Sequence, residues 1–173
     1  MNQMPLWFER KFEFNFAVEL HPNLSERLLG TPARLEEIAR GSVHGLMMAK
    51  SGGKWSAQEH VGHLLDLEPL WTARIDDYLA GASELTAADL NNRRTHDANH
   101  NARALDQILR EFRGARLKLA KRVEGIDTAL LERAVLHPRL RQPMRLVDHL
   151  YFVAEHDDHH LACIRGLLKG AGR

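Results

Sequence analysis

Several features that would assign a chain to a special class are scarce in these 173 residues. There is one cysteine, Cys163, so an internal disulfide framework is excluded, which suits a reducing compartment. No apolar run reaches the roughly 18 residues that span a bilayer, and the region after Met1 lacks the basic flank and apolar run of a signal peptide. The net charge is only +1 with histidine neutral, so no strong field attracts nucleic acid or an anionic membrane. We therefore expect a cytoplasmic protein whose partners are neither nucleic acids nor membranes.

Histidine, by contrast, is abundant. The chain has 11 histidines, and they gather between His96 and His100 and between His137 and His160. The length suits a single domain, and the hydrophobic fraction of 44% is ordinary for a globular chain. The clusters of histidine are therefore the place to look for function.

Apolar residues recur at a spacing of three to four in four segments, which predicts four amphipathic helices. With no strong strand pattern, an all-α, antiparallel four-helix bundle is expected. A long polar connection, residues 82–100, joins the second and third helices, and it is either functional or crosses from one end of the bundle to the other. The predicted helices cover residues 31–50, 56–79, 102–123 and 143–169.

The helix starts differ in clarity. Thr31 followed by Pro32 predicts an N-cap and a first helical residue, so the bundle domain is expected to span residues 31–173. Ser56 and Glu59 have the spacing of a capping box at the start of the second helix, which Gly81 ends.

Residues 1–30 are expected to form a strap that packs on the bundle. Residues 11–16 alternate with period two, which favours an extended segment, and a short helix is the alternative. The strap side chains expected to contact the bundle are the aromatic ones, namely Trp7, Phe12, Phe14 and Phe16.

Two histidine pairs have the i, i+4 spacing at which two imidazoles on a helix can bind one metal ion. His156 and His160 continue the apolar face of the last helix, where an unpaired buried imidazole would cost on the order of 1–3 kcal/mol. His96 and His100 lie in the polar connection, where solvation is expected to satisfy them. The pair on the last helix is therefore the metal-site candidate, and a hydrogen-bonded core pair is the alternative.

A third ligand has to come from another helix. His63 is the best candidate, because it lies about two turns into the second helix on its apolar face. Glu59 and Asp66 flank it and are candidates to orient its imidazole or to act as a base. Three histidines would leave positions open for water or substrate.

Other residues near these positions have simpler interpretations. Asp157 and Asp158 are expected on a solvated face, and His149 lies about 10 Å from His156 along the helix, too far for the same ion. Cys163 is expected to be a small core residue, with an approach to the metal or a nucleophilic role as the alternative. The candidates for the substrate pocket are Trp71, Asn92, His96 and His159.

The pattern Lys54-Trp55-Ser56-x-x-Glu59-x-x-x-His63-Leu64, followed far downstream by His156-x-x-x-His160-Leu161, resembles the DinB-like (DinB/YfiT-like) superfamily of metalloenzymes over roughly residues 30–170. The resemblance implies a four-helix bundle with a long connection between the second and third helices. It also implies a divalent metal (zinc, nickel or iron) held by His63, His156 and His160, and a homodimer. It assigns no ligand role to His60, His149 or His159.

Family analogy suggests the reaction. Known activities include transfer and isomerisation with low-molecular-weight thiols such as bacillithiol, mycothiol or glutathione, and hydrolysis is the alternative. We expect a metal-bound thiol or water to attack a small electrophile held by residues 86–100 and by the linker from Arg139 to Arg145. A non-catalytic metal-binding stress-response module and a metal-free bundle are the other hypotheses.

Overall fold

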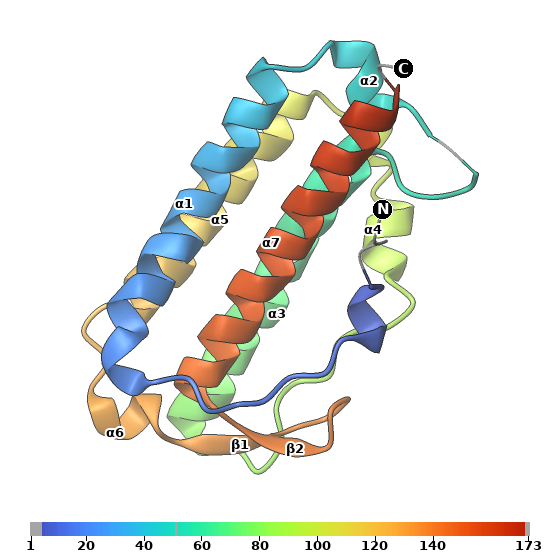
Figure 1. Cartoon of the computed structure of the whole chain (residues 1–173). Helices are drawn as coiled ribbons and strands as arrows, with labels where there is room; N and C mark the ends of the chain where they lie inside the picture. The colour runs from blue at the N-terminus through green and yellow to red at the C-terminus, as the bar shows by residue number, and fades with distance from the viewer. Residues whose placement is uncertain (1–4, 51, 172–173) are drawn as a thin grey trace.

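A computed structural model describes residues 5–50 and 52–171 of the chain. Its four long helices form a bundle with a small hairpin at one end (Figure 1). The predicted all-α four-helix bundle is therefore confirmed. The long helices are α1 (His21–Arg40), α3 (Ala57–Ala80), α5 (Leu105–Val123) and α7 (Leu146–Ala171).

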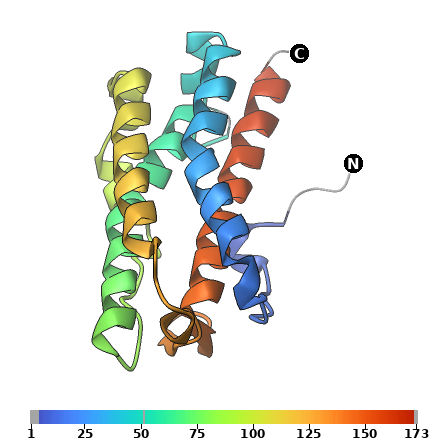
Figure 2. The same cartoon turned by 90° about the vertical axis from the view of Figure 1, so that its left-hand side faces the viewer.

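The order of helices around the bundle differs from a simple up-and-down arrangement. Helices α1 and α3 each pack on both α5 and α7, so α1 lies diagonally opposite α3, and α5 lies diagonally opposite α7. The colour ramps show α1 and α7 running one way and α3 and α5 the other (Figures 1 and 2). The antiparallel expectation thus holds for α1 with α5 and for α3 with α7, whereas the neighbours α3 and α5, and likewise α1 and α7, are parallel.

The connection between α3 and α5 explains this topology. It returns along the bundle from the end of α3 to the level at which α3 began, so that α5 runs parallel to α3 (Figure 1). The connection carries two short helices, α4 (Arg93–Asp97) and η3 (His100–Ala102). Of the two alternatives for this connection, a crossing from one end of the bundle to the other is observed.

Helix α1 begins at His21, ten residues before the predicted start at Thr31. Pro22 occupies the first turn, whereas Pro32 lies inside the helix and supplies no N–H for the carbonyl of Leu28. The Arg116 guanidinium approaches that carbonyl instead, with Nη1 3.4 Å from the oxygen. The prediction was wrong because a tertiary contact compensates for the interior proline, so residues 21–30 are helical rather than part of the strap.

The other boundaries shift as well. Helix α1 ends at Arg40, and a separate short helix, α2 (His44–Met48), follows. A two-stranded hairpin, β1 (Ala134–His137) with β2 (Gln142–Arg145), was not predicted. Pro143 lies in β2, so α7 begins at Leu146 instead of near Pro143. Four-residue strands are too short to show a clear alternation in the sequence.

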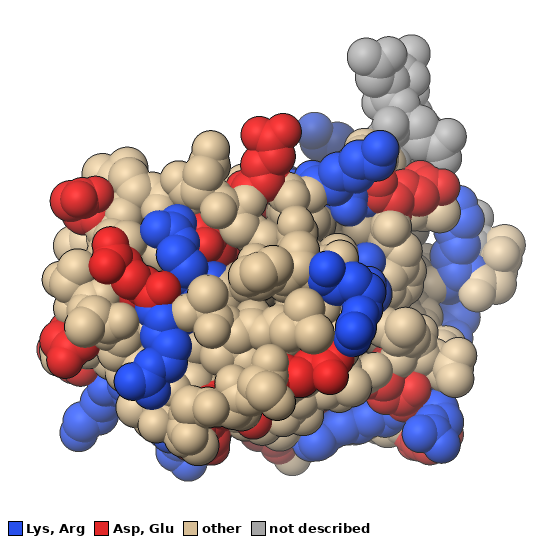
Figure 3. Space-filling view, turned by 90° about the horizontal axis from the view of Figure 1, so that it is seen from below, with Lys and Arg blue, Asp and Glu red and all other residues tan. Residues whose placement is uncertain are grey.

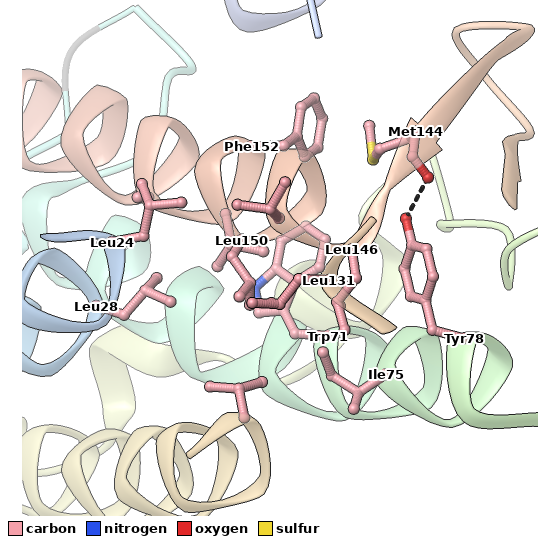
Figure 4. Packing of buried hydrophobic residues seen from close by; sticks show 14 of the residues in the cluster. Leu24, Leu28, Trp71, Ile75, Tyr78, Leu131, Met144, Leu146, Leu150 and Phe152 are labelled. Carbon is pink, nitrogen blue, oxygen red and sulfur yellow. Dashed lines mark hydrogen bonds between the residues drawn. The ribbon is translucent and has the colours of Figure 1, made fainter. Parts of the chain in front are cut away.

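The hairpin and the short helix α6 (Thr128–Leu131) close one end of the core. The Tyr78 hydroxyl donates to the Met144 carbonyl oxygen at 2.8 Å, and Trp71 and Ile75 pack with Leu146 and leucines of α1 and α7 (Figure 4). Seen from this end, basic and acidic side chains are interspersed around a central area that carries neither, on the part that the structure describes (Figure 3). Among the described residues no helix is long and apolar enough to cross a membrane.

The strap consists of η1 (Trp7–Glu9), an extended segment and η2 (Val18–Leu20). The extended segment predicted over residues 11–16 is present. Phe12 is buried, and its ring lies 5.1 Å from that of Phe152 on α7. Arg10 is held by Glu155 of α7 at 2.6 Å. The predicted aromatic contacts of Trp7, Phe12, Phe14 and Phe16 with the bundle are all confirmed.

A buried ion cluster joins all four long helices. Arg116 of α5 is fully buried and donates to Glu68 of α3 at 2.6 Å and to Asp157 of α7. Asp157 also accepts the Thr31 hydroxyl of α1 at 2.8 Å. The prediction that Asp157 is solvated was wrong, because its charge is matched by an arginine 41 positions earlier in the chain. Asp158 accepts from Arg27 and Arg34 at the surface.

Candidate metal centre

Three buried histidines converge between α3 and α7. His63, His156 and His160 are at most 5% exposed, and each offers a nitrogen within 4.8 Å of the nitrogens of the other two. His156 and His160 lie one turn apart on α7, with their Nε2 atoms 3.1 Å apart. The convergence predicted from the spacing and from the faces of the two helices is therefore observed.

Hydrogen bonds determine which nitrogen of His63 is free. Its Nδ1 lies 3.0 Å from the Thr95 hydroxyl. Against the effect of burial, His100 and then a hydrogen bond from Thr95 lower the pKa of the Asp66 carboxylate. Because an ionised carboxylate only accepts, Thr95 donates to Asp66 and accepts from the Nδ1–H of His63. His63 therefore presents the lone pair of Nε2 to the centre.

Asp66 acts on the centre through Thr95 rather than by touching His63. Its other partners are His100, whose Nε2 lies 2.7 Å away, and Arg94, whose Nε lies 3.5 Å away. His100 is fully buried, so the prediction that solvation satisfies it was wrong. Gly62 permits this contact, because a Cβ at that position would stand 2.2 Å from the His100 ring. The connection between α3 and α5 thus packs directly against the helix that carries His63.

His160 has an outer partner that the sequence did not indicate. The Nδ1 atoms of His60 and His160 lie 2.8 Å apart, so one donates to the other. If Nε2 of His160 faces the centre with a lone pair, Nδ1 carries the proton and donates to His60. This is the arrangement that orients histidine ligands in metal sites.

Glu59 is engaged at the start of α3. Its carboxylate accepts the Ser56 N–H at 2.8 Å and pairs with Lys50 at 2.7 Å, while the Ser56 hydroxyl accepts the Glu59 N–H at 3.1 Å. The predicted capping box is therefore confirmed. The interaction that orients His63 comes instead from Thr95.

The histidines suit a divalent ion. Burial lowers the pKa of His63 to about 3 and keeps the pKa values of His156 and His160 well below the usual range, so all three are neutral at pH 7. Two nitrogens bound to one zinc ion stand about 3.0–3.4 Å apart, which the Nε2 separation of 3.1 Å matches. The Nδ1 of His156 is buried with no hydrogen-bond partner among the described residues. A metal ion bound to Nε2 would give the imidazole of His156 a partner at that nitrogen.

A cavity of about 140 Å³ opens onto the three histidines. All three tryptophans of the chain line it, from the strap (Trp7), the start of α3 (Trp55) and the middle of α3 (Trp71). Trp7 packs edge-on against His156, with ring centroids 4.9 Å apart. The strap therefore contributes a wall of the site, a role that the sequence left open.

The candidate pocket residues divide into two groups. Trp71 and Asn92 line the cavity, whereas His96 and His159 are not among its lining residues. His96 lies against Trp55, with centroids 5.7 Å apart, and the Nε2 of His159 lies 3.7 Å from the Cys163 sulfur. Burial raises the pKa of the Cys163 thiol, and Cys163 does not belong to the cluster of potential ligands among the described residues.

Several residues around the centre could not be predicted from the sequence. Thr95 and His60 gave no signal of their own, although His60 lies three positions before His63 and so on a nearby face of α3. The far end of the cavity is lined by Arg74, His137 and Arg139, of which only Arg139 belonged to a segment expected to hold substrate.

The fold and the site together define a four-helix-bundle protein with a buried three-histidine centre that could hold a metal ion. The sequence profile of the DinB superfamily matches residues 20–164, and the chain belongs to this superfamily. The structure is similar to that of YfiT from Bacillus subtilis, with a TM-score of 0.81 and 18% identity over 95% of this chain and 94% of that chain. YfiT is described as a probable metal-dependent hydrolase with an unusual four-helix bundle topology. No curated protein sequence matches significantly.

Proposed function

We propose that this protein is a metal-dependent enzyme acting on a small molecule, with zinc, nickel or iron held by His63, His156 and His160. The proposal rests on one observation: the three neutral, buried imidazoles converge, and all three also line a cavity. A purely structural histidine cluster has no need of such a cavity, whereas a catalytic metal centre needs a position open to substrate.

The ion would supply a positive charge that acidifies a coordinated water or thiol. The protein would supply orientation. Thr95 and His60 would orient the imidazoles of His63 and His160 through their Nδ1 atoms, and Asp66 would hold Thr95. The three tryptophans that line the cavity would reduce the contact of the reacting groups with water, which strengthens electrostatic interactions there.

Hydrolysis is the reaction we propose first. The support is the description of YfiT as a probable metal-dependent hydrolase on the same fold. Thiol transfer, expected from the family resemblance, is tested in the same assay by adding glutathione, bacillithiol or mycothiol to the metal-loaded protein. The expected homodimer stays a prediction, which light scattering of the purified protein tests.

Metal content provides the primary test. The protein should purify with, or take up, about one divalent ion per chain as measured by elemental analysis. His156→Ala and, separately, His63→Gln should reduce the content to below about a tenth, because two imidazoles bind far more weakly than three.

The matched control is His159→Ala, which removes a histidine from the same helix beside the centre and should leave the metal content unchanged. Circular dichroism identifies variants that fail to fold. A folded wild-type protein that takes up no divalent ion would refute the proposal and leave a hydrogen-bonded histidine cluster. Equal loss of metal in the His159 variant would refute the ligand assignment.

A further inference from the structure

The cavity has a second, cationic end beyond the histidine centre. Arg74 of α3 lines it and is 2% exposed, and Arg139 in the turn of the hairpin lines it too. Arg74 Nε donates to the Thr86 carbonyl oxygen at 2.9 Å, and its Nη1 lies 3.2 Å from His137 Nε2. The Nη2 of Arg139 is buried without a hydrogen-bond partner among the described residues.

Neither guanidinium is neutralised. Within the described chain, no carboxylate oxygen lies within 4.0 Å of Arg74 or Arg139, although 16 such ion pairs form elsewhere. The acids nearby have other partners: Asp77 accepts the Thr86 N–H, and Asp89, which also lines the cavity, pairs with Arg93. A buried charge such as that of Arg74 is strongly unfavourable without a counter-charge, and the buried Nη2 of the half-buried Arg139 shares this environment. Its presence beside a cavity therefore indicates a negatively charged ligand.

The pKa of Arg74 reflects a buried, cationic environment. Burial and, to a smaller extent, the charge of Arg139 lower this pKa to about 10, against the opposing effects of Tyr78 and Asp77. Burial and both arginines lower the pKa of His137 to about 3, so it is neutral at pH 7. The positive potential of the two guanidiniums is thus only partly compensated, because Asp77 and Asp89 have other partners.

Trp71 connects the cationic end with the histidine centre. The Arg74 guanidinium carbon lies 5.5 Å from the indole centroid, and the His156 ring lies 5.6 Å from it. The Cα–Cβ bonds of a helix tilt toward its N-terminus, so the long Arg74 side chain reaches back toward His63 on the same helix. One small molecule can therefore contact both ends of the cavity.

We propose that Arg74 and Arg139 bind a carboxylate group of the substrate while its reactive group faces the three histidines. This inference rests on the proposed function, because it names the substrate class of the same centre: a short carboxylic acid derivative. A planar guanidinium and a carboxylate form paired, charge-assisted hydrogen bonds. The volume of about 140 Å³ is below the roughly 300–1,000 Å³ of sites for drug-sized ligands, so the substrate is small.

Tryptophan fluorescence can measure binding directly, because all three tryptophans line the cavity. Propionate and succinate, titrated at constant ionic strength, should change the emission of the metal-loaded protein, whereas propionamide and succinamide should not. Arg139→Gln and Arg74→Gln should each weaken succinate binding at least tenfold, since each removes a charge-assisted hydrogen-bond pair.

The matched control is Arg141→Gln, in the same hairpin turn, whose side chain is exposed and pairs with Glu84. It should bind succinate like the wild type. Arg139 is half-buried in a turn, so its variant should fold even if the Arg74 variant does not. Equal binding of amides and acids, or equal weakening by Arg141→Gln, would overturn the proposal. Binding of inorganic phosphate with no response to either carboxylate would overturn the carboxylate assignment.

The titration repeated on metal-free protein separates this proposal from the metal centre. There a carboxylate cannot bind to the ion, so Arg139-dependent binding reports only on the cationic end. Such binding in a protein that never takes up metal would refute the proposed function and support the anion site. Loss of all carboxylate binding once the metal is removed would overturn the anion site, since the carboxylate would then have bound the ion.

Discussion

Thr95 illustrates how one side chain sets the chemistry of another. It is 4% exposed on α4, and its hydroxyl lies between His63 and Asp66. Without that hydroxyl the imidazole of His63 could rotate or exchange its proton between the two nitrogens. The position is therefore a sensitive site at which to probe the centre without touching a proposed ligand.

Thr95→Val should lower metal affinity by about 10–100-fold while full loading is still reached at saturating metal. Valine keeps the shape but neither accepts from His63 nor donates to Asp66. Competition titration with a chromogenic chelator measures the affinity. Thr86→Val, an exposed position on the same connection, is the control and should match the wild type. Unchanged affinity in the Thr95 variant would show that His63 is oriented by something else.

At the scale of elements, the packing of the connection against α3 depends on a glycine. Gly62 lies inside α3, where glycine costs about 1 kcal/mol relative to alanine. The helix accepts this cost because the His100 ring of η3 occupies the space of a Cβ. This contact holds the connection, and with it Thr95, against the helix that carries His63.

Gly62→Ala should destabilise the protein by about 1–3 kcal/mol, because the clash with His100 outweighs the gain in helix propensity. Urea denaturation of the metal-free protein measures the free energy of unfolding. Gly114→Ala in α5 is the control: its Cβ would meet nothing within 4 Å, and it should stabilise by about 0.5–1 kcal/mol. Equal stabilisation by both substitutions would contradict the close approach.

At the scale of the whole molecule, the bundle buries ionisable groups with unequal compensation. Arg116 pairs with two carboxylates, Glu68 and Asp157, from two other helices, and burial raises the pKa of Glu68 to about 7. His149 of α7 is fully buried, and neither ring nitrogen has a hydrogen-bond partner among the described residues. Burial first, and then the charge of Arg74, keep the pKa of His149 well below its usual range. Such a group couples the stability of the fold to pH.

The free energy of unfolding of the metal-free protein should fall as the pH falls below about 6.5. His149 is neutral when folded and gains a proton on unfolding, so acid favours the unfolded state. His149→Leu removes this proton uptake and an unpartnered polar group at similar volume. The variant should gain about 1.4 kcal/mol relative to the wild type between pH 7.5 and pH 5.5. Urea denaturation at both pH values measures this difference, and a constant difference would show that His149 titrates in the folded protein as it does in the unfolded chain.

The sequence by itself determined the main elements and the residues of the histidine centre. Ser56, Glu59 and Gly81 delimit α3 through short-range hydrogen bonds, so its ends could be predicted closely. His156 and His160 share a face of one helix through its period, and His63 has its place on the apolar side of another. The length and polarity of the connection likewise indicated that it crosses the bundle.

Only the tertiary structure decided the partners that come from distant segments. The start of α1 depends on Arg116, which approaches the carbonyl above Pro32, and the burial of Asp157 depends on the same arginine. Thr95 reaches His63 because the connection folds back along α3, and Arg74 faces the same cavity as Arg139 because a short hairpin closes the end of the bundle. Helical periodicity relates residues that share a face of the same helix. It carries no information on which charges and hydroxyl groups meet across helices. In the proposed site, such contacts orient the histidine side chains and bring the two arginines to the cavity.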